Sequence, residues 1–208
     1  VLQDIQRHRG ATTSLLAGKE QFRERADKAR AAVDAAVQKV DAALGAHGRD
    51  LGKIENWDKF RSGWQTLRTG FATLNPQANA KQHTELIAIL LESMAAVADQ
   101  SGLVLDPDLD SFYAMLMSVV ELPPTTERMG QGRALGSLIL TEKALTQDRR
   151  DSLIGAFAEM RLRERAILNA GSKVLEANPE AAAHLKPVFE AARNATAQYT
   201  RSAPQNLP

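Results

Sequence analysis

The sequence predicts an all-α fold: an elongated antiparallel helical bundle of about seven helices, or two stacked helical bundles. Apolar residues recur at spacings of three and four along almost the whole chain, which is the period of an amphipathic helix. The alternating pattern of a β-strand is nearly absent, and 44% of the 208 residues are hydrophobic, which is enough to bury a core. These observations together predict helices that pack along one another.

Turn signals divide this helical pattern. Glycines or Asn-Pro pairs mark most of the ends. The predicted helices cover residues 1–17, 20–45, 56–74, 80–102, 106–142, 147–177 and 179–203. The third helix is the most apolar on one face, and its aromatic residues are predicted to be core: Trp57, Phe60, Trp64 and Phe71. The fifth is expected to bend at Pro123-Pro124, because proline cannot donate a helical hydrogen bond.

The amino-acid composition argues against several classes of function. A net charge of +1 and an aromatic content of 5% favour neither nucleic-acid binding nor base stacking. The absence of cysteine excludes disulfides and thiol chemistry. Apolar runs are too short to span a bilayer. Because a helical pattern is already under way at Val1, we interpret the chain as part of a longer protein.

Two arginines occupy positions where the helical pattern predicts burial. Arg9 continues the seam of Leu2, Ile5, Thr12 and Leu16. Arg133 continues a second seam. When the sequence is aligned with itself at an offset of 124 residues, Arg9 falls on Arg133, and both lie in a helix followed by a tight turn and a long helix. The second seam consists of Leu122, Thr126, Met129, Arg133, Gly136 and Leu140. A buried guanidinium needs a carboxylate of the protein or an external anion, so both partners are considered.

The two alternatives predict different neighbours. In the first, each arginine forms a salt bridge with an acidic residue from the set Asp4, Glu92, Asp99 and Glu164. In the second, both converge on a small anion, with hydroxyl donors from Thr12, Thr13 and Ser137. Glycines beside the arginines favour access for a ligand. Tyr113 is assigned either to the core or to the wall of such a pocket.

Motifs of catalysis and metal binding are missing. The aspartates of Asp106-Pro107-Asp108 are typical of a helix start, with Asp106 or Asp108 as the N-cap, and no EF-hand pattern follows them. Four histidines are scattered singly, without metal-ligand spacing. They are His8, His47, His83 and His184. We therefore expect no enzymatic activity, no metal and no cofactor.

A resemblance to a known family extends over about residues 1–200. It rests on three segments: Gln6-x-x-Arg9-Gly10, residues 105–113, and the run from Gly130-Gln131-x-Arg133 to Gly136. The chain resembles the extracytoplasmic helical sensor domains of bacterial histidine kinases, chemoreceptors and diguanylate cyclases. The arginine-glycine helix is similar to that of nitrate- and nitrite-sensing domains, in which arginines hold the anion. Here His8 replaces the usual acidic residue before the arginine.

The resemblance implies one periplasmic helical sensor domain over residues 1–208, with internal halves 1–103 and 104–208. It implies a homodimeric inner-membrane receptor, first of all a histidine kinase of a two-component system, with a chemotaxis receptor as the alternative. The partner is then a small anion or carboxylate, or a periplasmic binding protein. The alternative to a sensor domain is a non-sensory helical scaffold or partner-binding module, whose arginines form ordinary salt bridges.

Overall fold

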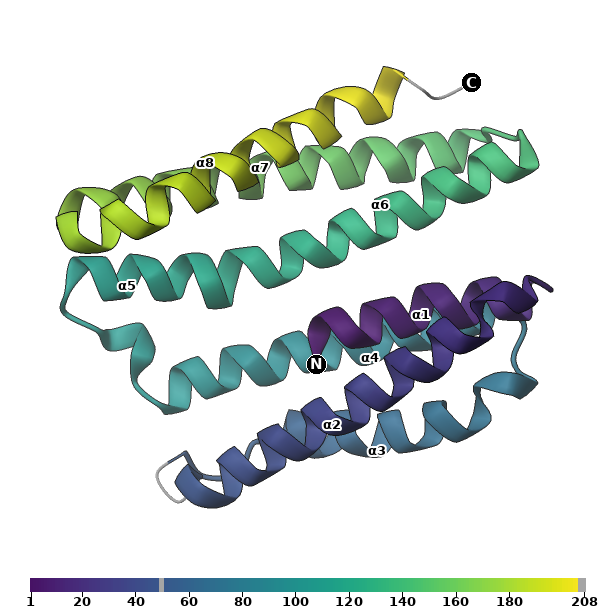
Figure 1. Cartoon of the computed structure of the whole chain (residues 1–208), viewed down its shortest axis with the longest axis horizontal. Coiled ribbons are helices and arrows are strands. Elements are labelled where there is room, and N and C mark those ends of the chain that lie inside the picture. Colours follow the sequence, from purple (N-terminus) through teal and green to yellow (C-terminus); the bar gives the residue numbers. More distant parts are fainter. Residues whose placement is uncertain (49–50, 206–208) are drawn as a thin grey trace. The chain divides into compact units, whose positions relative to one another are not determined.

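The computed structural model describes residues 1–48 and 51–205, and for residues 140–142 and 199–205 it describes the backbone alone. The chain is 89% helical, and the described residues form no strand, so the predicted all-α class is confirmed. The α-helices are α1 (Leu2–Leu16), α2 (Arg23–His47), α3 (Glu55–Gly70), α4 (Pro76–Gln100), α5 (Leu109–Met115), α6 (Leu122–Glu142), α7 (Gln147–Ala177) and α8 (Pro179–Gln205) (Figure 1). No helix in the described part is both long and apolar enough to cross a membrane.

The chain divides into two compact units, Val1–Ser101 and Gly102–Pro208, which we call unit 1 and unit 2. Unit 1 contains α1 to α4, and unit 2 contains α5 to α8. Gly102, the first residue of unit 2, has a φ of 73°, in the left-handed region that glycine adopts without strain.

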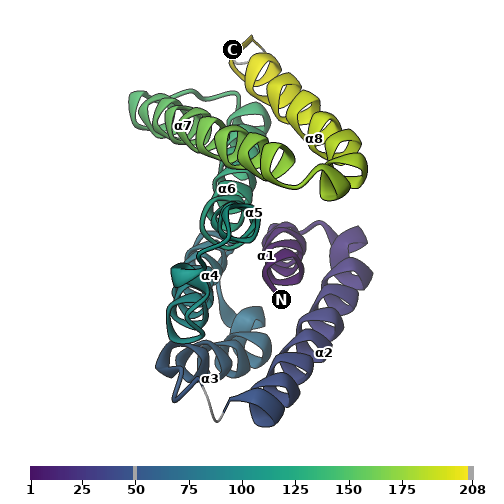
Figure 2. The same ribbon diagram turned by 90° about the vertical axis from the view of Figure 1, so that its left-hand side faces the viewer.

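Unit 1 is a four-helix bundle in which α1 packs against α2 and α4, and α3 packs against α4 (Figure 2). The ends of its helices follow from local sequence. Gly18 has a φ of 83° in the turn after α1, and the Asn75 side chain caps α4 by accepting from the Ala78 amide at 2.8 Å. Pro76 then occupies the first turn of α4, where no amide donor is needed.

The core of unit 1 lies between α3 and its neighbours. Trp57, Phe60 and Trp64 are each no more than 5% exposed, which confirms the predicted aromatic seam. The other buried apolar members of this cluster are Ile5, Val33, Ile54, Leu67, Leu86, Ile87 and Leu90. Phe71, the fourth predicted aromatic, packs against the cluster but is only partly buried.

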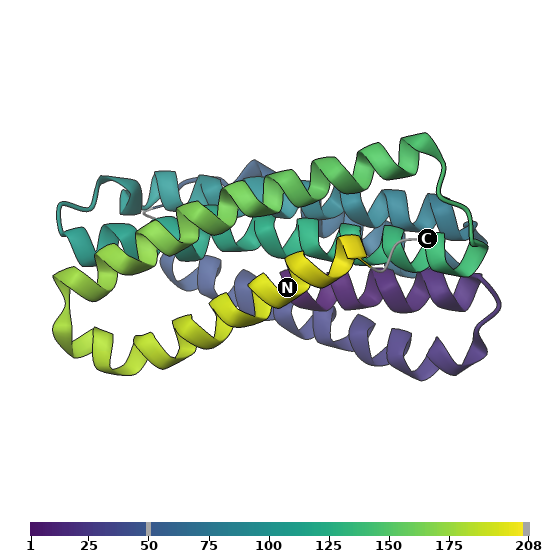
Figure 3. The same cartoon turned by 90° about the horizontal axis from the view of Figure 1, so that it is seen from above.

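In unit 2, α7 packs against α5, α6 and α8, and α8 runs back beside α7 (Figure 3). A small apolar cluster of Ile139, Leu153, Phe157 and Met160 joins α6 to α7. The approach of α8 depends on Gly171, because a Cβ at that position would overlap the ring of Phe189.

The predicted fifth helix is not one α-helix. A π-helical segment, Leu116–Glu121, separates α5 from α6, and Pro123 and Pro124 follow as the second and third residues of α6. A wider helical turn therefore lies just before the prolines, which themselves stand in the first turn of α6, and the bend at Pro123-Pro124 stays a prediction. The start of α5 is confirmed in part, because Asp108 is its N-cap residue. The Asp106 side chain accepts from the Asp108 amide at 3.0 Å. Among the described residues, the Asp108 side chain itself forms no capping hydrogen bond.

The register predicted for α6 is wrong. Arg133 is exposed, and so are Leu122 and Thr126 of the same predicted seam. The buried positions in the described part of α6 are Pro123, Thr125, Glu127, Gly132 and Ile139. Around Arg133 the buried residue is its neighbour Gly132, about 100° away around the helix. Leu140, the last member of the predicted seam, lies outside the residues whose side chains are described.

Candidate functional site

The polar residues of α1 gather where this helix faces α4. Arg9 is 7% exposed and Thr12 is fully buried, so the register predicted for α1 is confirmed. The Arg9 guanidinium donates to the Thr84 hydroxyl at 2.9 Å. Thr84 in turn donates to the Ala80 carbonyl at 2.9 Å, so its hydroxyl is held in place from both sides.

Asn79 of α4 gathers the two threonines of α1. Its amide nitrogen donates to the hydroxyls of Thr12 at 3.0 Å and Thr13 at 2.9 Å. Because Thr12 itself donates to the His8 carbonyl at 2.7 Å, its oxygen must accept from Asn79, and this fixes which end of the amide points at α1. The Asn79 oxygen is buried and has no hydrogen-bond partner among the described residues.

Two histidines lie in the same interface. His8 and His83 are at most 1% exposed, and the distance from His8 Nδ1 to His83 Nε2 is 2.8 Å. His83 Nδ1 lies 2.8 Å from the Asn79 carbonyl, which only accepts, so Nδ1 carries the hydrogen. In the neutral pair His83 Nε2 therefore accepts and His8 Nδ1 donates. His8 Nε2 is left as a bare lone pair, buried and unpartnered in the described part of the chain.

The surroundings keep both rings neutral. Burial lowers the pKa of His8 to about 3; the neighbouring His83 and Arg30 act in the same direction, and Asp34 opposes them. Burial also lowers the pKa of His83 to about 4, with the hydrogen bond to the Asn79 carbonyl opposing and the charge of Arg9 contributing. Taking either ring to its cation therefore costs free energy in this fold.

Two aromatic rings contact the His8 imidazole. The rings of Trp64 and Phe71 stand nearly perpendicular to it, with centroid distances of 5.0 Å and 5.6 Å. The Trp64 indole donates to Asp34 of α2 at 2.8 Å. His8 is thus connected through one tryptophan to a carboxylate on a third helix.

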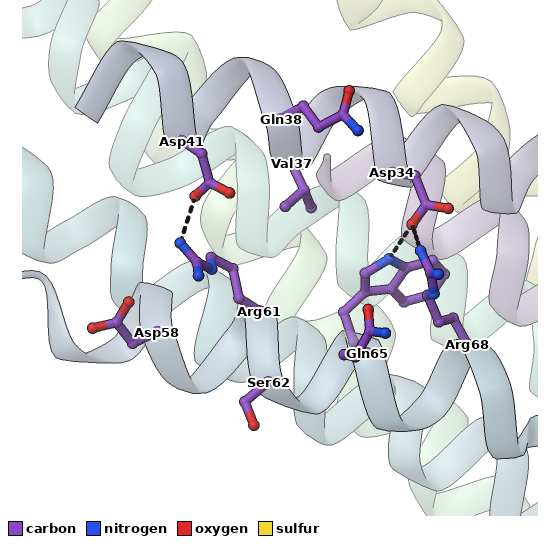
Figure 4. A pocket seen from close by; sticks show the side chains of 10 residues that line it. Asp34, Val37, Gln38, Asp41, Asp58, Arg61, Ser62, Gln65 and Arg68 are labelled. Atoms are coloured by element: carbon purple, nitrogen blue, oxygen red, sulfur yellow. Dashed lines mark hydrogen bonds and ion pairs between the residues drawn. The ribbon is translucent and has the colours of Figure 1, made fainter. Parts of the chain in front are cut away.

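Asp34 belongs to a repeated arrangement along the α2–α3 side of unit 1. Trp64 and Arg68 both reach Asp34, and Trp57 and Arg61, seven residues earlier, both reach Asp41. The ion pairs measure 3.0 Å for Arg68–Asp34 and 3.1 Å for Arg61–Asp41 (Figure 4). A groove of about 430 Å³ runs between these bridges, with Val37 among its lining residues. Because Asp34 is paired with Arg68 and Asp41 with Arg61, we interpret the groove as a polar connection between α2 and α3.

The predicted site residues of unit 2 do not form a comparable cluster. Arg133 and Ser137 are exposed on α6, and Tyr113 is half-buried in α5 with its ring edge-on to Phe112. Unit 2 has its own charged network, in which Glu159 pairs with Arg128 at 2.6 Å and with Arg163 at 3.3 Å, and Arg163 also reaches Glu121. Neither Arg133 nor Ser137 lines the groove of about 480 Å³ beside this network.

The structure thus brings together Arg9, Thr12 and Thr13 from the predicted set. It adds four residues that were not predicted: His8, Asn79, His83 and Thr84. The sequence contained a sign of Asn79 and His83. Counting back along the apolar seam of α4 from Leu86 by three residues reaches His83, and by four more reaches Asn79, so both occupy positions where burial is expected. Of the proposed carboxylate partners, Asp4 pairs with the Val1 amino group and Arg7, and Glu92 accepts from Asn56.

Comparison with known proteins gives a single positive finding. Curated proteins and solved structures provide no significant match. The family model for nitrate and nitrite sensing matches residues 1–207. The chain therefore belongs to this family of extracytoplasmic sensing domains, the input domains of membrane signalling receptors.

Proposed function

We propose that the chain is the periplasmic input domain of a bacterial inner-membrane receptor, a sensor histidine kinase, and that it senses nitrate, nitrite or a related small oxyanion at Arg9. The observation that carries this proposal is the buried guanidinium of Arg9 on α1, which donates to the Thr84 hydroxyl of α4 in an interface that also contains the hydroxyls of Thr12 and Thr13. The family match over residues 1–207 supports the ligand class. The domain itself performs no catalysis.

The chemistry of the cluster suits a small planar anion. A guanidinium presents several N–H donors in one plane, which matches the planar oxygens of nitrate and the bent oxygens of nitrite. Thr12, Thr13 and Thr84 supply hydroxyls in the same interface, and those of Thr12 and Thr84 would donate to an anion in place of their present bonds to backbone carbonyls. Anion binding would exchange the present hydrogen bonds of Arg9 for bonds to the ligand, in surroundings where burial strengthens charge-assisted bonds.

Signalling would follow from the position of these groups on two helices. Arg9 lies on α1 and Thr84 on α4, so a ligand held by both favours one packing of these helices over another. The ligand can shift that equilibrium only by its difference in affinity for the two packings. We propose that in a homodimeric receptor this displacement of α1 passes to a membrane helix and then to the output domain.

Thermal unfolding in the presence of anions tests this proposal. Nitrate or nitrite at a hundredfold excess over Kd should stabilise the folded chain by about 2.7 kcal/mol. Chloride at equal ionic strength should not. Arg9→Ala should abolish the nitrate effect, and Arg9→Lys, which keeps the charge without the planar donors, should weaken it.

Arg133→Ala is the comparison variant, because Arg133 is an exposed arginine of another helix. If Arg9 acts alone, this variant keeps the nitrate effect; if both arginines hold the anion, as the sequence pattern predicted, it loses the effect. Failure of nitrate, nitrite and short carboxylates to stabilise the wild-type chain would contradict the proposal and leave a periplasmic binding protein as the signal.

A further inference from the structure

A continuous path of polar and ring contacts crosses all four helices of unit 1. It runs from the Asn79 carbonyl and His83 on α4 to His8 on α1, then to Trp64 on α3 and Asp34 on α2. Every step except the ring contact between His8 and Trp64 is a hydrogen bond of 2.8 Å. Most of the other buried side chains of unit 1 are apolar, so this path is a distinct polar feature of its core.

The path has one open position, the lone pair of His8 Nε2. This atom is buried and unpartnered in the described part of the chain, although a buried acceptor without a donor is costly. A proton satisfies it without any added volume. The resulting imidazolium would meet the Trp64 and Phe71 rings, which attract cations, and would lie near the Asp34 carboxylate.

The same pair is linked electrostatically to the proposed anion site. Arg9 follows His8 in the chain, and its charge acts on His83 against protonation. An anion bound at Arg9 offsets that charge. We propose that unit 1 takes up a proton at the His8–His83 pair when an oxyanion binds at Arg9, so that the domain responds to the anion and to acidity together. This inference rests on the proposed function of Arg9.

The charges around the histidine pair determine whether anion binding favours or opposes protonation. From α1 and α2, Arg9 and Arg30 oppose a proton, and Asp34 favours it. Ion pairs hold several other charged side chains of these helices, among them Asp4–Arg7 on α1, Asp27–Arg30 on α2, Arg68–Asp34 between α3 and α2, and Lys81–Glu85 on α4. Arg9 is the opposing charge that lies at the proposed anion site. An anion bound there offsets this charge, so binding should become tighter as the pH falls.

The size of the effect follows from the pKa of about 4 at His83. Offsetting a neighbouring charge raises a pKa by about one to two units. The Kd for nitrate should then fall by about two- to tenfold between about pH 7.5 and about pH 5, with the pair titrating as one unit. Proton uptake per bound nitrate should rise from near zero to between about 0.4 and about 0.8 over the same range.

Isothermal titration calorimetry with nitrate tests this directly. Titrations in two buffers of different ionisation enthalpy at each pH give the number of protons taken up. The first variant is His8→Asn, whose amide nitrogen can replace Nδ1 as donor to His83 while the Nε2 lone pair is removed. The second is His83→Gln, whose amide oxygen can replace Nε2 as acceptor. His184→Gln, on the exposed part of α8, is the control.

Each outcome bears on the inference. Proton uptake in the wild type and in His184→Gln, together with nitrate binding without proton uptake in either variant of the pair, supports it. Nitrate binding with the same Kd and no proton uptake from about pH 7.5 to about pH 5 overturns it and leaves the proposed function standing. Absence of nitrate and nitrite binding at every pH overturns both.

Discussion

Acidification should destabilise unit 1 through its two buried histidines. In the folded chain the pKa is lowered to about 3 at His8 and about 4 at His83, from an ordinary value of 6.5. Both values lie below the unfolded value, so the unfolded chain takes up protons first as the pH falls. The stabilisation is therefore fully present above about pH 6.5 and is lost as the pH falls from there toward about 4.

The magnitude follows from these two shifts. Each histidine that stays neutral in the folded chain and is protonated in the unfolded chain costs about 1.4 kcal/mol per pH unit. Over the 1.5 units from the ordinary value of 6.5 to about pH 5, the cost is about 2 kcal/mol per ring and about 4 kcal/mol for the pair. Carboxyl groups ordinarily titrate near pH 4, below this window, so the histidines dominate the expected change.

Tryptophan fluorescence isolates this effect from unit 2. The chain has two tryptophans, Trp57 and Trp64, and both lie in the core of unit 1. Urea unfolding followed by this signal at several pH values should show the free energy of unfolding falling by about 4 kcal/mol between about pH 7 and about pH 5.

The double variant His8→Asn, His83→Gln is the control for that measurement. It should be less stable at neutral pH but should show a much smaller pH dependence over the same range. A free energy of unfolding in the wild type that stays constant between about pH 7 and about pH 5 would show that the fold does not hold the two rings neutral.

Two further predictions concern unit 2. Gly171→Ala in α7 should loosen the contact with Phe189 and increase proteolysis within α8. The control is Gly155→Ala, also in α7, where a Cβ meets open space. This variant should raise the melting temperature, because alanine stabilises a helix by up to about 1 kcal/mol relative to glycine. Asn178 donates to Asp110 at 2.7 Å and accepts from the amide at the start of α8 at 2.9 Å. Asn178→Asp, which keeps the cap but sets two carboxylates against each other, should lower the melting temperature, and should do so less below about pH 4 than at neutral pH.

The helical fold could be predicted because its signals are local. A spacing of three and four, proline in a first turn and glycine after a last turn act within a few residues of chain. Arg9 could be placed for the same reason, since the apolar residues of α1 fall on one face and leave a single register.

The register of α6 could not be predicted in the same way. Its small and apolar residues allow two adjacent registers, one with Arg133 inside and one with Gly132 and Leu135 inside. The structure has the second, in which the glycine faces α7 and the arginine is exposed. Local periodicity does not separate these registers, because the choice depends on the surface of the neighbouring helix.

The histidine pair was missed for a related reason. His8 and His83 are 75 residues apart, and each alone has no metal or catalytic spacing. Their hydrogen bond depends on how α1 and α4 are rotated about their axes. The polar positions at Asn79 and His83 in the seam of α4 were the available sign that this interface contains more than apolar packing.

A crystal structure of the chain with nitrate is the decisive test of anion sensing at Arg9. Nitrate should lie within hydrogen-bonding distance of the Arg9 guanidinium, with a hydroxyl of Thr12, Thr13 or Thr84 as a further donor. Arg9 paired with internal carboxylates alone, with nitrate absent from its donors at a concentration that saturates binding in solution, would contradict it.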